Sequence, residues 1–296
     1  MTMPREYRGL HVLAEELPPS LAADVEVVWQ NLFERCDKTQ RDWYEAFAES
    51  EHRPQLLRAF ACSQALAELC VRHPAWLIEL FSTDQLLSFL PDEAWQAELS
   101  ALCSGCDNAD SLAKILRDFR NRHWLRVVWR DLNRLADMEE TVRDLSRLAD
   151  ACVEIALAVL HRQLVVERGE PQSADGAPQQ LVVIAMGKLG AGELNLSSDI
   201  DLIFTYPQAG STVGGPRVDD NQAFFIRLGQ RLIKALDIRT ADGFVFRVDM
   251  RLRPYGESGP LVISFDALEE YYQDQGRDWE RYALIKARCI AGDHQE

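Results

Sequence analysis

The sequence predicts an α+β protein in which a large helical N-terminal region precedes a small mixed α/β core. Two observations support this prediction. Apolar residues recur at offsets of three and four through the first half of the chain, which is the spacing of helices that bury one face. After residue 180 the pattern changes to short β-branched and alternating runs, which are typical of strands.

Residues 1–170 are predicted to be mainly helical. Apolar side chains recur at helical spacing over 112–119 and again over 125–132, so both stretches should bury one face. Asp137 followed by Glu140 resembles a helix N-cap with its reciprocal partner. We therefore expect a further long helix to begin there.

Residues 171–296 are predicted to form the α/β core. We expect this core to be truncated at its C-terminus, because the sequence stops without a clear domain end. The core is preceded by a stretch rich in Gly, Pro, Ser, Asp and Gln, from residue 168 to 180, which predicts a loop or a domain boundary. The elements expected after it are strands at 181–186, 199–206 and 245–253, a helix containing Phe225 and Leu236, and a helix from about Phe265 with Ser264 as N-cap.

The composition excludes several classes of function. A chain of 296 residues with 47% hydrophobic residues can form two compact domains. Its formal net charge of -15 argues against broad attraction to a nucleic-acid backbone and leaves room only for a local basic site. No apolar run approaches the length that crosses a bilayer, so we expect a cytoplasmic protein with neither nucleic acid nor membrane as a partner. The seven scattered cysteines favour reduced thiols over a disulfide framework.

Two aspartates in the second predicted strand suggest a metal site. Side chains two apart in a strand point to the same side, so Asp199 and Asp201 share one face, while Ile200 and Leu202 can enter the core from the other. Neighbouring carboxylates repel each other unless cations or basic groups compensate them. Mg²⁺ prefers oxygen ligands and is usually held by one or two carboxylates together with substrate phosphate. The pair therefore predicts a divalent cation at this edge.

The later strand supplies a third acid among bases. Arg247, Asp249, Arg251 and Arg253 project from one face of the run 245–253. If this strand lies beside the first acidic pair, Asp249 becomes a third metal ligand, and Arg251 or Arg253 can pair with phosphate oxygens. The combination predicts a site for phosphoryl chemistry.

A glycine-rich turn lies between the first predicted strand and the acidic pair. Gly187 and Gly190 would let backbone amides approach a phosphate closely, and Lys188 adds a positive charge. Ser197 and Ser198 precede the acids and could donate hydrogen bonds to phosphate oxygens. Capping or turn formation explains these two serines almost as well.

Each of these features also has a simpler explanation. An Asp-x-Asp strand is more often a solvated face, and alternating Arg and Asp often form only a surface ladder of ion pairs. The glycine spacing, Gly-x-x-Gly-x-Gly, differs from that of dinucleotide-binding loops. Lys188 lacks both the upstream glycine and the following Ser or Thr of a P-loop. Only the combination of the acids, bases and glycines favours a phosphate site.

Three motifs give the chain a specific resemblance. They are AMGKLGAGELNLSSDIDLIFTYP at 185–207, FRVDMRLRPYGESGPLV at 246–262 and GRDWERYALIKAR at 276–288. Together they resemble the bacterial glutamine synthetase adenylyltransferases, also called adenylyl-removing enzymes, and the helical segment 129–150 resembles the N-terminal region of that family. The resemblance implies a polymerase-beta-like nucleotidyltransferase core. Ala191 departs from the family pattern, which commonly has another glycine there.

The resemblance also implies a reaction. Members of this family have two related catalytic halves, and ELNLSSDIDLIF at 193–204 resembles the N-terminal, adenylyl-removing half. Inorganic phosphate would attack the adenylyl-tyrosine of glutamine synthetase and release ADP and free tyrosine. Asp199, Asp201 and Asp249 would be the catalytic metal ligands, for two Mg²⁺ ions or for Mn²⁺. Implied partners are glutamine synthetase, phosphate, ADP or ATP and, in the full-length enzyme, a PII-type nitrogen-signalling protein.

Two other functions fit the same residues. The forward reaction, ATP-dependent adenylylation of glutamine synthetase, can use the same metal triad, and spacing does not separate the two directions. A non-catalytic regulatory module that binds a nucleotide is the alternative from another class. The activity of the isolated chain is open, because we expect the chain to be a fragment.

Overall fold

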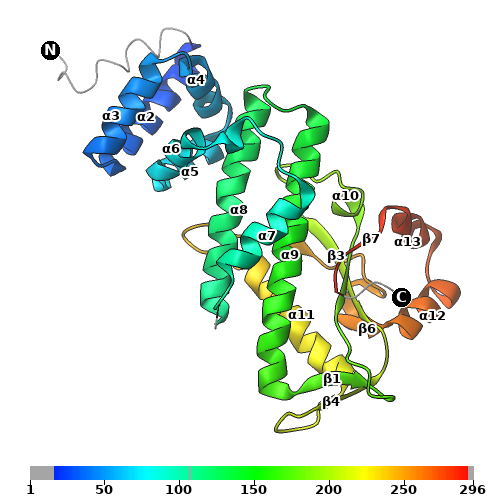
Figure 1. The fold of residues 1–296 in the computed structure, drawn as a ribbon. Coiled ribbons are helices and arrows are strands. Elements are labelled where there is room, and N and C mark those ends of the chain that lie inside the picture. The colour runs from blue at the N-terminus through cyan, green and yellow to red at the C-terminus, as the bar shows by residue number, and fades with distance from the viewer. Residues whose placement is uncertain (1–16, 107, 293–296) are drawn as a thin grey trace. The chain divides into compact units, whose positions relative to one another are not determined.

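The computed structural model describes residues 17–106 and 108–292, and it confirms the α+β class (Figure 1). Within the described part of the chain, the residues up to 168 form helices and no strand. The helices of this part are α2 (Pro19–Arg35), α3 (Lys38–Glu49), α4 (Arg53–Cys62), α5 (Gln64–Arg72), α6 (Pro74–Ser82), α7 (Asp92–Leu102), α8 (Ala109–Leu132) and α9 (Met138–Arg168), with a 3₁₀ turn η2 (Asp84–Leu86) after α6.

The second part alternates strands and helices. Its strands are β1 (Glu170–Ser173), β2 (Val182–Ala185), β3 (Ile200–Tyr206), β4 (Gly210–Val213), β5 (Val248–Asp249), β6 (Val262–Ser264) and β7 (Arg288–Ala291). Its helices are α10 (Gly187–Gly190), α11 (Asn221–Asp237), α12 (Phe265–Asp274) and α13 (Asp278–Ala283), with 3₁₀ turns η3 (Gly256–Ser258) and η4 (Leu284–Lys286).

By packing, the chain divides into two compact units. Of the described residues, one unit contains those up to Leu90 together with Asn121–Thr141, and the other contains those of Pro91–Arg120 together with those from Val142 onward. This division follows contacts, so it differs from the compositional boundary predicted at residue 170. Both units are discontinuous in sequence, because α8 contributes residues to each of them.

The first unit has an aromatic core. Trp129 is fully buried and meets the Phe81 ring edge-on, with ring centroids 5.4 Å apart. Arg126 is also buried, and its guanidinium donates to the backbone carbonyls of Gln85 and Ser88. Trp129 is thus a core residue, as its helical spacing beside leucine and valine predicts.

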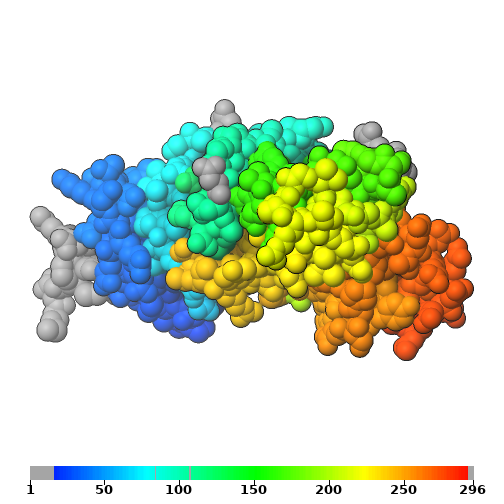
Figure 2. All heavy atoms as spheres, turned by 90° about the horizontal axis from the view of Figure 1, so that it is seen from below, coloured from blue at the N-terminus to red at the C-terminus, as the bar shows by residue number. Residues whose placement is uncertain are grey.

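The second unit is organised around a mixed sheet in the strand order β5-β3-β2-β7. β3 pairs antiparallel with β2, and on its other side it pairs in parallel with β5 at its start and with β6 at its end. Helix α11 packs on this sheet with its apolar face, where Gly229 allows close approach to the Phe204 ring. In the space-filling view the yellow atoms of α11 and its flanking segments lie against the orange atoms of the C-terminal segments (Figure 2).

The predicted helix caps are confirmed at two positions. Asp137 accepts the backbone N–H of Glu140 at 2.8 Å, and Ser264 accepts that of Ala267 at 3.3 Å. The Glu140 carboxylate, expected to reach back to the cap, instead accepts a hydrogen bond from Arg130. The buried guanidinium is a stronger partner for this carboxylate than the backbone N–H of Asp137, because a hydrogen bond between two charged groups is charge-assisted.

Two predicted segments are corrected. The strand predicted over 245–253 shrinks to β5, because the Asp249 side chain accepts the N–H of Arg251 at 2.8 Å and so diverts this N–H from a ladder. The stretch 168–180, predicted as a loop or a domain boundary, contains the strand β1, which pairs antiparallel with β4. Pro and Gln in β1 give little local strand signal, so this pairing depends on a distant partner. Within the described part of the chain, no helix combines the length and apolar composition needed to cross a membrane.

Candidate functional site

The structure brings two of the predicted acids side by side. β3 and β5 are parallel neighbours, with Asp201 directly opposite Asp249 and Ile200 opposite Val248. Asp199 lies just before β3, two positions from Asp201 on the same side of the strand. The pairing of strands on which the sequence argument depended is therefore present.

The neighbouring carboxylates of Asp249 and Asp199 affect the ionisation of Asp201. Burial raises the pKa of Asp201 above its ordinary value, and the negative charges of Asp249 and Asp199 raise it further. Arg251 and Lys188 oppose this effect. A carboxylate with a raised pKa beside two further acids is one whose negative charge the surroundings compensate incompletely. Such a group is a natural binding point for an added cation.

The Asp249 carboxylate is hydrogen-bonded to Arg251, two residues later in the chain. Its Oδ1 accepts the backbone N–H of Arg251 at 2.8 Å, and its Oδ2 accepts the Arg251 Nε–H at 2.8 Å. These hydrogen bonds hold the pKa of Asp249 below its ordinary value. The Arg251 side chain is 71% exposed, so its guanidinium can turn toward a phosphate without leaving a buried position.

Asp199 has a partner that the sequence argument did not assign. The Arg247 Nε–H donates to Asp199 Oδ1, and Arg247 Nη2 donates to the Ser197 carbonyl at 2.5 Å. The backbone carbonyl of Arg247 also accepts the N–H of Ile200 at 2.9 Å, just ahead of the β3–β5 pairing. The alternation over 245–253 predicts that Arg247 lies on the same face as Asp249 and Arg251, but it does not predict the contact with Asp199.

The glycine-rich turn lies directly against the acids. Gly187 begins α10 with a φ of 56°, and a Cβ at this position would lie 2.6 Å from Asp201 Oδ2. A Cβ at Gly190, at the other end of α10, would lie 1.9 Å from the carbonyl oxygen of Lys286. Neighbouring atoms thus leave no room for a side chain at either glycine. At Gly187 the neighbour is Asp201, which with Asp199 and Asp249 forms what we call the acidic cluster.

The remaining predicted phosphate ligands occupy local turns. Ser198 Oγ donates to Asn195 Oδ1 at 2.7 Å and lies 3.4 Å from Lys188 Nζ, while the Ser197 N–H donates to the same Asn195 oxygen at 3.3 Å. These contacts match turn formation, one of the two explanations that the sequence allows. The Arg253 guanidinium donates to the backbone carbonyls of Met250 at 2.7 Å and of Glu257 at 3.2 Å, both within its own loop.

The donor set suits a hard cation, with one condition. Carboxylate oxygens are the ligands that Mg²⁺ and Mn²⁺ prefer. In the described residues, however, no three acids, histidines or cysteines are already arranged as a metal site, and Asp199 and Asp249 each hold an arginine. Arg247 and Arg251 are both partly exposed, so cation binding requires them to share or release carboxylate oxygens.

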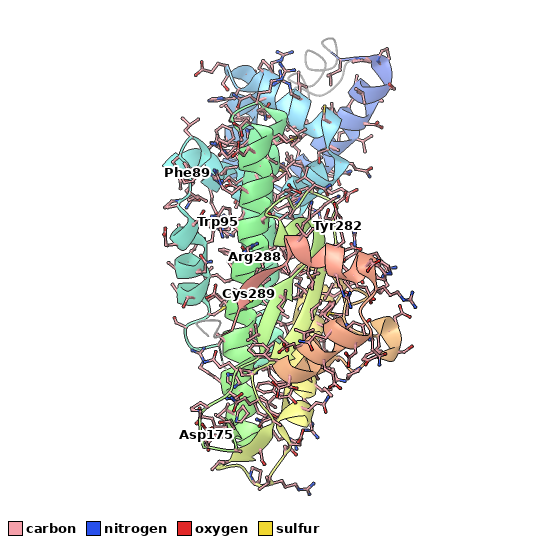
Figure 3. The ribbon with its side chains drawn as sticks, turned by 90° about the vertical axis from the view of Figure 1, so that its right-hand side faces the viewer. Phe89, Trp95, Asp175, Tyr282, Arg288 and Cys289 are labelled. Carbon is pink, nitrogen blue, oxygen red and sulfur yellow. The ribbon has the colours of Figure 1, made fainter. Side chains whose placement is uncertain are left out.

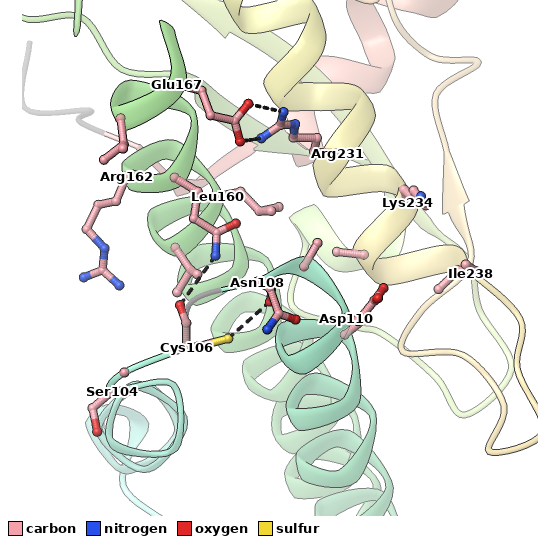
Figure 4. Close-up of a pocket in the computed structure, with 17 residues that line it drawn as sticks. Ser104, Cys106, Asn108, Asp110, Leu160, Arg162, Glu167, Arg231, Lys234 and Ile238 are labelled. Carbon is pink, nitrogen blue, oxygen red and sulfur yellow. Dashed lines mark hydrogen bonds and ion pairs between the residues drawn. The ribbon is translucent and has the colours of Figure 1, made fainter. Parts of the chain in front are cut away.

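A separate pocket of about 940 Å³ lies in the second unit (Figure 4). It is bounded by the α7–α8 connection, α9 and α11, and Arg231 on α11 forms a double ion pair with Glu167 on α9, at 2.9 and 2.6 Å. None of the predicted phosphate-site residues lines this pocket. We therefore locate the candidate site at the acidic cluster.

Comparison with known proteins identifies the family. The sequence model of the glutamate-ammonia ligase adenylyltransferase family matches residues 53–296. Proteins named bifunctional glutamine synthetase adenylyltransferase/adenylyl-removing enzyme are 56% identical over 252 residues in Pseudomonas aeruginosa and 55% identical over 246 residues in Hahella chejuensis. These alignments cover 85% and 83% of this chain and 26% of each relative, so the chain spans about a quarter of their length. The chain belongs to the glutamate-ammonia ligase adenylyltransferase family.

Proposed function

We propose that this chain provides a catalytic site for deadenylylation of glutamine synthetase by metal-dependent phosphorolysis. The observation that supports it most is the direct pairing of Asp201 with Asp249 on neighbouring strands, with Gly187 packed against the Asp201 carboxylate. The relatives are named for both adenylyl transfer and adenylyl removal. The resemblance of residues 193–204 to the removing half supports the removing direction.

The proposed reaction exchanges one phosphorus–oxygen bond for another. An oxygen of inorganic phosphate attacks the adenylyl phosphorus of adenylyl-tyrosine, and the bond to the tyrosyl oxygen breaks. ADP leaves, and the tyrosyl oxygen takes up a proton that the phosphate gives up. Enzymes accelerate such transfers mainly by positioning and by stabilising negative charge.

Within this proposal each group has a role. Asp199, Asp201 and Asp249 would hold Mg²⁺ or Mn²⁺, which when bound would neutralise phosphate charge and stabilise the departing tyrosyl oxygen. Lys188 and Arg251 lie around Asp201 and would pair with phosphate oxygens. The other proposed phosphate contacts are Gly187, Gly190, Ser197, Ser198 and Arg253.

We also propose the setting of the reaction. Glutamine synthetase is the protein substrate, phosphate the second substrate, and ADP the product. A PII-type nitrogen-signalling protein regulates the full-length enzyme, and the site acts in the cytoplasm. The forward reaction with ATP is the competing direction.

One assay tests the proposal. The chain is incubated with adenylylated glutamine synthetase, Mg²⁺ and phosphate, and ADP release is measured, in parallel with AMP transfer from ATP to the unmodified enzyme. We expect phosphate-dependent ADP release that Asp201→Asn abolishes. Asp266→Asn is the matched control, because it removes an exposed aspartate in the first turn of α12.

The other outcomes are equally informative. AMP transfer without ADP release would assign the forward direction to this chain. If Asp201→Asn changes neither turnover nor nucleotide affinity, the acidic cluster has no role in the chemistry, and a non-catalytic module is the better description.

A further inference from the structure

Arg288 is a charged residue of the third motif that points inward. It is the first residue of β7 and lies opposite Ala185, the last residue of β2, from which the chain enters the glycine-rich turn. Figure 3 shows Arg288 on β7, beside the green helix α9. Its place in the sheet therefore puts its guanidinium next to both α9 and α10.

The Arg288 guanidinium joins these two helices. Nη1 and Nη2 donate to the two carboxylate oxygens of Asp150 on α9, at 2.8 and 3.1 Å. Nη2 also donates to the Leu189 carbonyl at 2.9 Å, and Nε donates to the Gly190 carbonyl at 3.2 Å. Arg288 thus makes four hydrogen bonds, two to an acid and two to the end of α10.

Asp150 fixes the guanidinium in place. Its side chain is only 5% exposed, and a buried carboxylate is strongly destabilising unless it is paired and hydrogen-bonded. Arg147, one turn earlier on α9, contacts the same carboxylate at 3.5 Å and also pairs with Asp92 at 2.6 Å. The double hydrogen bond to Arg288 uses the planar fork that lysine lacks.

Arg288 adds side-chain donors to the end of α10, where the Leu189 carbonyl also accepts the Gly192 N–H at 3.0 Å. Helix carbonyls in the last turn have no partner within the helix, and α10 is only one turn long. The Lys286 carbonyl approaches Gly190 too closely for any side chain there. Residues 286–288 therefore wrap the C-terminal end of the same turn whose first residue, Gly187, lies against Asp201.

We propose that Arg288, anchored by Asp150, is a positioning residue for the turn 187–190. It holds the Leu189 and Gly190 carbonyls in place and thereby sets the position of Gly187 and Lys188 over the acidic cluster. This inference rests on the proposed function, because it makes the turn the phosphate-binding element. Arg288 itself contacts no part of the acidic cluster in any hydrogen bond described above.

Arg288→Lys tests the inference while keeping the positive charge. An ammonium group can pair with Asp150 but cannot also serve both carbonyls with the geometry of a guanidinium. We expect ADP affinity and phosphorolysis to fall about tenfold to a hundredfold, the usual range for outer-shell partners of a site. Amide hydrogen exchange at 190–193, whose N–H groups bond within this turn, should accelerate. Arg281→Lys is the matched control, because Arg281 is exposed and donates to the Tyr272 and Gln273 carbonyls.

Each outcome decides one question. Faster exchange at 190–193 together with weaker ADP binding, with a melting temperature close to that of the control variant, supports positioning. Unchanged exchange, or faster exchange with normal ADP binding and turnover, overturns it. If the unaltered chain neither binds ADP nor releases it, the proposed function fails, and the exchange data still show whether Arg288 holds the turn.

Discussion

At the scale of single residues, Asp201 has a charge that the fold disfavours. Its folded pKa is raised by burial and by the neighbouring carboxylates of Asp249 and Asp199. A carboxyl group whose folded pKa exceeds its unfolded value opposes folding when ionised, so this contribution to stability improves as pH falls through the folded pKa. The same negative charge on Asp201 would attract a cation.

Asp201→Asn should therefore separate stability from function. At neutral pH and without divalent ions, we expect the free energy of unfolding to rise by about 0.5–1 kcal/mol, the range for relieving one like-charge contact between strands. Thermal denaturation with and without Mg²⁺ checks this. The unaltered chain should gain stability from Mg²⁺, and the variant should not; an equal gain in both would place the cation elsewhere.

Gly187 allows a prediction with an internal control. Gly187→Ala would place a Cβ 2.6 Å from Asp201 Oδ2, whereas Gly192→Ala, at a φ of 71°, meets nothing within 4 Å. Both substitutions cost about 1 kcal/mol for the left-handed backbone. Only Gly187→Ala should also lower turnover and Mg²⁺-induced stabilisation. Equal losses in the two variants would mean that the turn does not contact the working site.

The residues of the candidate site were predictable to different degrees. Side chains alternate between the two faces of a strand, and this rule is local. It therefore predicted that Asp199 and Asp201 share one face of their strand and that Asp249 shares a face with Arg247 and Arg251 on the later strand. The partnership of Arg247 with Asp199 joins two segments far apart in sequence, and no local spacing predicts which arginine an acid selects. The role of Arg288 was hidden for the same reason, since its anchor Asp150 belongs to the helical region.

At the scale of elements, long helices were the easiest to predict. The face of α11 repeats apolar residues at helical spacing, and the structure buries it against the sheet. β1 and β5 were difficult, because each is only a short ladder that depends on a distant strand. The extent of β5 was overestimated because alternation continues in the sequence beyond the point where Asp249 captures the Arg251 N–H.

The ion pair between α9 and α11 gives a pH-dependent prediction. The hydrogen bonds from Arg231 lower the pKa of Glu167, so its contribution to stability exists above the ordinary glutamate pKa and is lost as pH falls through the lowered value. Both side chains are substantially exposed, so Glu167→Gln should cost less than about 1 kcal/mol at pH 7.

Chemical denaturation over a range of pH measures this effect. The difference between the unaltered chain and Glu167→Gln should shrink to nothing in acid. Glu154→Gln provides the control, because this exposed glutamate on α9 makes no ion pair among the described residues. A difference that persists below the carboxylate pKa would assign the cost to packing rather than charge.

At the scale of the whole molecule, the compact unit that contains the site is assembled from two separate stretches of chain. Residues Pro91–Arg120 contribute α7 and the first half of α8 to it, with Trp95, Leu112 and Leu116 buried. The Arg120 guanidinium also lies over the Phe246 ring at 5.8 Å, next to the strand that contains Asp249. This compact unit therefore extends across the compositional boundary predicted at residue 170.

A fragment of residues 142–296 should consequently fail to fold cooperatively. It keeps every described strand together with Asp199, Asp201 and Asp249, but it loses α7 and α8, which cover apolar surface of this unit. We expect broad thermal unfolding and strong binding of an apolar fluorescent dye, compared with a sharp transition for the whole chain. A sharp transition for the fragment would show that the sheet and its helices suffice.

The parallel pairing of β3 with β5 has a consequence for synthesis of the chain. Parallel neighbours require a crossover, and here α11 supplies it between the two acids. When residue 201 has been synthesised but residue 249 has not, the proposed cation site still lacks one of its acids. The acidic pair can come into existence only once α11 has docked, so magnesium sensitivity should appear late, as a marker that the crossover is complete.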